Sequence, residues 1–111
     1  MKVVGLAELA SSSFSRELVG EEHDAGICVI FVEAPPGRGP ALHRHPYEEI
    51  FIVQEGEALF VAGDEERIVR AGEIVVAPAN TPHRFVNTGD GVLRQVDIHV
   101  SPRFVTEWLA D

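Results

Sequence analysis

The sequence predicts an all-β domain built as an antiparallel sandwich or barrel. Short apolar segments rich in β-branched residues recur roughly every eight to twelve residues, and glycine, proline, asparagine and aspartate separate them. No stretch before residue 103 has the apolar spacing of an amphipathic helix. The chain has 111 residues, which is the size of one domain, so we expect a single domain over residues 1–111.

The expected strands follow one another along the chain with short turns between them. A short strand or loosely held arm is expected within residues 1–13, and a weak strand over 14–19. The segment 35–40 contains three prolines and must be a loop, because proline cannot donate to a ladder. Residues 104–109 are expected to form one or two helical turns. The other expected strands cover residues 25–34, 49–54, 58–62, 67–70, 74–77, 83–87 and 92–100.

Composition excludes several classes of protein. The chain is 45% hydrophobic and 24% charged, as in a globular domain, and its net charge of −9 argues against nucleic-acid binding. No apolar run approaches the length of a membrane span, and the first residues lack the core of a signal peptide, so a cytoplasmic protein is expected. The single cysteine, Cys28, cannot form an internal disulfide and is expected to be buried.

Two histidines and a glutamate at odd positions indicate a metal site. In an extended segment His43, His45 and Glu49 share one face and can converge. Imidazole and carboxylate ligands suit iron, manganese, nickel, copper or zinc. A fourth ligand from further along the chain is His83. The alternative, a pair of exposed histidines before a strand, explains none of this phasing. Glu48 has the opposite parity from the histidines, so Glu49 is the predicted ligand.

Two segments resemble the paired motifs of the cupin family. Residues 37–56 resemble the first motif, in which glycine, His-x-His, glutamate and glycine occur at set spacings; the matching residues are Gly37, His43, His45, Glu49 and Gly56. Residues 72–87 resemble the second motif, and the matching residues are Gly72, Pro78, His83 and Asn87. Asn80 stands where the family usually has glycine. Asparagine tolerates a left-handed turn better than other non-glycine residues, so this departure should cost little.

The resemblance implies a small double-sheet jelly-roll barrel with one divalent transition metal ion per chain. It implies that three histidines and Glu49 hold the metal, and that Glu49 either stays bound or acts as a catalytic base. It also implies a homodimer. Asn87 is expected to be structural, tying down the turn that follows it, and Gly56 and Gly72 are expected in turns with unusual backbone angles.

Strand parity predicts the walls of a pocket beside the metal. Phe51 and Val53 share the parity of Glu49, and Phe85 shares that of His83, so these side chains should point inward. Tyr47 lies between the ligands and either reaches the mouth of the pocket or lies on the outer face. A pocket with such apolar walls favours an organic ligand of limited charge.

The last long strand has two interpretations. Its even positions are apolar except for Arg94, while its odd positions include Gln95, Asp97 and His99. The odd set either faces solvent or forms a polar wall of the pocket. We expect Asp97 to face solvent, and the sequence leaves His99 undecided between the two.

The strands also indicate a partner. In a sheet with one face exposed to solvent, apolar and polar side chains should alternate along each strand. Four of the expected strands are instead apolar on both faces, at residues 27–32, 50–53, 58–62 and 74–77. A second copy of the chain is the simplest cover, so a homodimer is expected.

Three functions remain open from the sequence. The first is a mononuclear metal centre acting on a small organic substrate, with dioxygenase- or isomerase-like chemistry. The second is a non-catalytic module that binds or senses a metal or small molecule, and the third is a metal-free structural barrel. The intact ligand set makes the third least consistent with the sequence. Fold and ligands do not choose the reaction.

Overall fold

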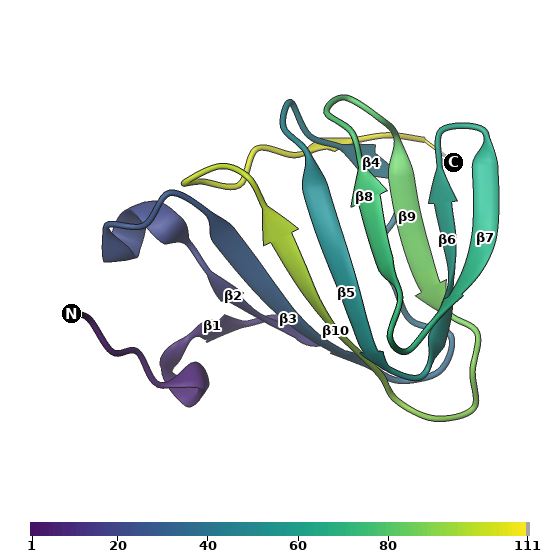
Figure 1. The fold of residues 1–111 in the computed structure, drawn as a ribbon, viewed down its shortest axis with the longest axis horizontal. Coiled ribbons are helices and arrows are strands. Elements are labelled where there is room, and N and C mark those ends of the chain that lie inside the picture. The colour runs from purple at the N-terminus through teal and green to yellow at the C-terminus, as the bar shows by residue number, and fades with distance from the viewer. Residues whose placement is uncertain (111) are drawn as a thin grey trace.

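Two antiparallel sheets face each other and form a barrel (Figure 1). The computed structural model describes residues 1–110. The six-stranded sheet has the order β1 (Ala10–Ser11), β2 (Ser15–Leu18), β3 (Cys28–Ala34), β10 (Leu93–His99), β5 (Glu49–Glu55), β8 (Ile74–Ala77). The five-stranded sheet has the order β11 (Glu107–Trp108), β4 (His43–Arg44), β9 (His83–Asn87), β6 (Glu57–Ala62), β7 (Glu65–Arg70). Two short 3-10 helices, η1 (Leu6–Glu8) and η2 (Gly20–His23), complete the described elements.

The predicted fold class is confirmed, and most predicted strands lie within two residues of the observed ones. The start of β3 differs: it begins at Cys28 and not at residue 25. Residues 25–27 lie between η2 and β3 and belong to neither, and the Ala25 N–H donates to the Gly20 carbonyl at the end of η2. Asp24 follows η2 with a left-handed backbone (φ 56°), which turns the chain into β3.

The expected helix over residues 104–109 is wrong. This segment is extended, and β11 pairs with β4, with Trp108 opposite His43. The Leu109 N–H donates to the Leu42 carbonyl, and the Arg44 guanidinium donates to the Glu107 carboxylate at 2.6 Å. In Figure 1 the yellow C-terminal segment crosses the end of the barrel to reach β4. The unpaired edge of β4 thus supplies the hydrogen bonds that a helix would have made internally.

The core between the sheets is built on three phenylalanines. Phe51 of β5 lies 5.1 Å from Phe60 of β6 and 6.1 Å from Phe85 of β9, ring centroid to ring centroid. Leu93 and Ala34, at the ends of two paired strands, are fully buried beside them. These residues fill the middle of the barrel and leave one end open to polar side chains.

Turn chemistry matches the expectations from the sequence. Gly56 and Gly72 have φ of 83° and 91°, and Asn80 adopts a left-handed φ of 65°, as its tolerance of that region predicts. The Asn87 side chain accepts a hydrogen bond from the Gly89 N–H at 2.9 Å, which fastens the turn. Cys28 is buried, as expected, and among residues 1–110 there is no helix long and apolar enough to cross a bilayer.

Candidate metal centre

The four predicted ligands meet at one end of the barrel because of strand register. His83 begins β9 and pairs with His43 of β4, while Glu49 begins β5 on the facing sheet. His45 follows β4 by one residue. All four side chains are buried, and one potential ligand atom from each lies within 4.8 Å of those of the others.

Backbone carbonyls fix the orientation of the three histidine rings. The Nδ1 atoms of His43, His45 and His83 each contact a carbonyl oxygen, which can only accept a hydrogen bond, so each ring donates from Nδ1. The acceptors are Ala41, Val105 and Thr81, at 2.7, 2.8 and 2.8 Å respectively. Each Nε2 therefore presents a lone pair, as a metal ligand requires. Anchoring of the other ring nitrogen is the usual support for such a ligand.

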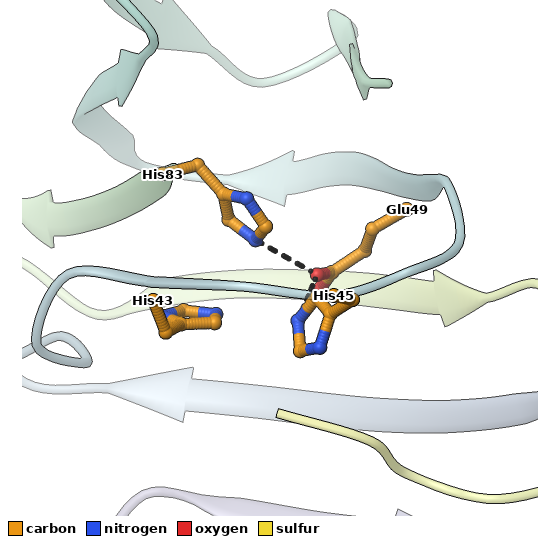
Figure 2. A group of neighbouring side chains, drawn as sticks. All are labelled: His43, His45, Glu49 and His83. Atoms are coloured by element: carbon orange, nitrogen blue, oxygen red, sulfur yellow. Dashed lines mark hydrogen bonds and ion pairs between the residues drawn. The ribbon is translucent and has the colours of Figure 1, made fainter. Parts of the chain in front are cut away.

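The Glu49 carboxylate completes a cluster of facing lone pairs. Its Oε1 lies 3.1 Å from Nε2 of both His45 and His83, and Figure 2 shows these two contacts meeting at the carboxylate. Two lone pairs at that distance repel unless a proton or a cation lies between them. Ligands about 2.1 Å from one metal ion and at right angles to each other are about 3 Å apart. The spacing of these donors therefore fits a divalent metal ion.

The protonation states also suit a metal. Burial lowers the pKa of His43 to about 4, which keeps its imidazole neutral. Burial alone would raise the pKa of Glu49, but the imidazole groups of His45, His83 and His99 around its carboxylate outweigh burial and hold the pKa below its usual range. Neutral imidazole and ionised carboxylate are the forms that bind metals.

A cavity of about 340 Å³ opens next to the cluster. Phe51 and Phe85 form part of its wall, as strand parity predicts. Val53 lies in the hydrophobic core and is not part of the wall. Tyr47 lies behind the wall, stacked on His45 with a centroid separation of 4.9 Å. A larger depression of about 520 Å³ between β7 and β8 lies away from the four-residue cluster, so the smaller cavity is the candidate substrate site.

The odd positions of β10 point into the barrel. Gln95, Asp97 and His99 are 1%, 2% and 3% exposed, so the expectation that Asp97 faces solvent is wrong. The strand is central, paired with β3 and β5 on its two sides, and its apolar even positions form the outer face of the sheet. His99 Nε2 lies 3.0 Å from Glu49 Oε2, and Asp97 and His99 both line the cavity.

A family model of the cupin domain matches residues 30–99. The chain belongs to the cupin family. This cupin is 33% identical over 85 residues to an uncharacterised protein, MJ1618, of Methanocaldococcus jannaschii, covering 74% of this chain and 68% of the relative. It is 29% identical over 101 residues to the HTH-type transcriptional regulator PuuR of Escherichia coli, covering 89% of this chain and 55% of the regulator.

The fold also resembles solved cupin structures. An oxalate oxidase in complex with the substrate analogue glycolate superposes with a TM-score of 0.80 at 25% identity, covering 97% of this cupin and 63% of the oxidase chain. This cupin therefore spans somewhat more than half the length of the regulator and of the oxidase.

The C-terminal segment supplies parts of the site that the sequence did not reveal. Phe104, Thr106 and Trp108 line the cavity, and the Val105 carbonyl anchors His45. No signal in the sequence of this cupin marks them, because alternation over so short a segment cannot be told from a helical turn.

Asp97 should make the stability of this cupin depend on pH. Its carboxylate accepts a hydrogen bond from Gln95 Nε2 at 2.8 Å, but burial, with the charge of Glu49 added, raises its pKa well above the usual value. The folded state then binds the Asp97 proton more tightly than the unfolded state. Stability from this group is present at low pH and is lost as pH rises above about 4, by at most about 1.4 kcal/mol per pH unit.

The variant Asp97→Asn should remove this loss. It keeps the acceptor for Gln95 and has no charge to bury, so we expect its free energy of unfolding to exceed that of the wild type increasingly as the pH rises from about 4 toward the raised pKa of Asp97. Urea unfolding of chelator-treated protein at several pH values measures the difference. Parallel stability curves for the two proteins would contradict the prediction.

Proposed function

We propose that this cupin binds one divalent transition metal ion through His43, His45, Glu49 and His83, and acts with it on a small organic molecule. The observation that carries the proposal is the convergence of three carbonyl-anchored Nε2 lone pairs on one ionised carboxylate. Iron, manganese, nickel, copper and zinc all accept such ligands, so the metal identity is left to measurement.

The cavity supports a small substrate of limited charge. Its volume of about 340 Å³ is at the small end of ligand sites; aromatic and aliphatic side chains supply most of its exposed lining, and Glu17, Glu49 and Asp97 are the carboxylates in its wall. A bound metal ion would supply Lewis acidity, polarising a substrate oxygen or lowering the pKa of a bound water. The chain's own contribution is to hold the metal and exclude bulk water, with Glu49 as the catalytic carboxylate. Dioxygenase- or isomerase-like chemistry is the expectation from the sequence, and the likeness to an oxalate oxidase that holds glycolate favours oxidative chemistry on a small oxygen-bearing substrate.

A second candidate is a non-catalytic module that senses a metal or small molecule. The 29% identity to the regulator PuuR, over 89% of this chain, favours it. Both functions use the same cavity, so occupancy alone does not separate them. An assay for turnover separates the two functions, because a sensor would bind its ligand without converting it. A cytoplasmic location, expected from the sequence, stays a prediction under either function.

Elemental analysis tests the metal directly. Protein purified without an affinity tag or chelator should contain near one equivalent of a first-row metal per chain, and metal-stripped protein should take up one equivalent on soaking. The loaded protein is then screened for oxygen consumption and for isomerisation with small hydroxy acids such as glycolate. Protein that contains no metal and takes none up would reject the proposal.

We also propose that two copies pair through the outer face of the six-stranded sheet. Ile74 and Val76 of β8 are 62% and 58% exposed, and Val76 lies opposite Ile50, which in turn lies opposite Ile98. The register carries this apolar row on to Val29 of β3. A contiguous apolar face of this kind is uncommon on a monomer.

A charge on this face should separate the copies. We expect Val76→Lys to shift the wild-type dimer to monomer, because the buried ammonium would lack a partner. Light scattering coupled to size exclusion measures the mass, and Asp90→Lys, at an exposed position in the turn before β10, is the matched control. A monomeric wild type, or a Val76→Lys variant that stays dimeric, would refute this surface.

A further inference from the structure

We propose that His99 and Tyr47 position Glu49 so that it offers a single oxygen, Oε1, to the metal. This inference rests on the proposed metal binding. It assigns a role to two side chains outside the set of ligands, one of them buried at the wall of the cavity and the other behind it.

The hydrogen bond at His99 Nδ1 differs in kind from those of the three ligand histidines. Its partner, at 2.7 Å, is the Tyr47 hydroxyl, which can donate as well as accept. The Val105 N–H points at the same hydroxyl at 3.4 Å and uses it as an acceptor. Among the contacts of the described residues, His99 Nδ1 is the acceptor left for the Tyr47 hydrogen. His99 is therefore protonated on Nε2, the opposite tautomer from His43, His45 and His83.

This tautomer aims a donor at the second oxygen of Glu49. His99 Nε2 lies 3.0 Å from Oε2, whereas His45 and His83 approach Oε1. The Nε2 atom is buried, and no described residue gives it a well-aligned hydrogen bond, so the 3.0 Å approach to Oε2 is the contact that can satisfy its N–H. The two oxygens of one carboxylate thus have different neighbours: Oε1 faces the lone pairs of two ligand rings, and Oε2 faces an N–H group.

Aromatic packing holds the pair in place. Tyr47 stacks on His45 at an interplanar angle of 11°, and Phe104 packs edge-on against His99 at 4.9 Å between centroids. Neither ring can turn without displacing its neighbours.

The arrangement has a consequence for the metal. A carboxylate that turns both oxygens to the ion occupies two coordination positions, whereas one whose second oxygen is held by His99 occupies one. His99 and Tyr47 are therefore positioning residues that keep a coordination position open for the substrate. Supports of this kind typically change metal affinity about 10- to 100-fold when they are removed.

Cobalt(II) is the probe, because its visible absorption reports coordination number. We expect His99→Leu to weaken cobalt binding about 10- to 100-fold and to change the visible spectrum, because Glu49 is then free to bind through both oxygens. His99→Gln keeps an N–H donor near the position of Nε2 and should restore both the affinity and the spectrum. Tyr47→Phe keeps the stacking on His45 and should shift the spectrum in the same direction as His99→Leu.

Each control separates one explanation from another. His23→Leu makes the same substitution in η2, outside the metal centre, and should leave cobalt binding unchanged. Wild-type protein that binds no cobalt would defeat the proposed function and this inference together. Wild-type binding with unchanged affinity and spectrum in His99→Leu would overturn only the inference. If His99→Leu does not fold, an unchanged spectrum in Tyr47→Phe overturns it.

Discussion

Replacing His45 with alanine should reduce bound metal from near one equivalent per chain to background. The variant removes one of three Nε2 ligands and also frees the Val105 carbonyl that holds the ring. Loss of a ligand should weaken binding by more than the roughly 100-fold that marks the upper range for its supporting partners. Elemental analysis after dialysis measures the metal, and competition with a chelator measures the affinity.

The His45→Ala result needs a control for the loss of any histidine. His23→Ala changes a residue of η2, outside the four-residue cluster, and should keep its metal. Circular dichroism should show that His45→Ala retains the strand signal, because the phenylalanine core does not include His45. A folded His45→Ala variant with a full equivalent of metal would contradict the assignment of the ligands.

Gly39→Ala should cause the largest loss of stability of any single methyl addition considered for this cupin. A Cβ at Gly39 would lie 1.9 Å from the Phe85 carbonyl oxygen and 3.0 Å from the Val86 Cα. Both are backbone atoms of β9, and the neighbouring loop is fastened to the same strand by two hydrogen bonds between its backbone and that of Asn87. Neither side can move away freely, so we expect a loss of about 3 kcal/mol or more.

The matched control is Gly26→Ala. No heavy atom lies within 4 Å of a Cβ built there, and its φ lies outside the left-handed region, so we expect a change within about 1 kcal/mol. Urea unfolding followed by tryptophan fluorescence measures both variants. Equal stability of Gly39→Ala and Gly26→Ala would mean that the loop is not packed against β9 as described.

Strand parity was enough to predict the inward side chains of the regular strands. Phe51 and Phe85 point where alternation places them, because their strands are paired on both sides and cannot slip without exposing the core. The same logic brought His43, Glu49 and His83 together, since each lies at the end of a strand that meets the same end of the barrel.

Strand parity did not predict which face of β10 points into the barrel, because that choice depends on what covers each face. The β10 strand has an apolar even face and a polar odd face, and polar residues ordinarily face water. Here Asp97 is buried because the odd face closes the cavity, while the apolar even face forms the outside of the sheet. The prediction of helical turns over residues 104–109 was wrong for another reason. Its extended form depends on pairing with β4, a contact between residues more than sixty apart in sequence that local propensity cannot register.

The crossing of the C-terminal segment over the barrel bears on how cupins should be compared. Residues 104–108 lie outside the matched region 30–99, yet they contribute the carbonyl that orients His45 and the N–H group that contacts Tyr47. Two chains with identical motifs but different segments after β10 can therefore present the same ligands with different ring orientations. The motifs alone therefore do not determine how the ligands are oriented, because the segment after β10, outside the matched region, contributes to it.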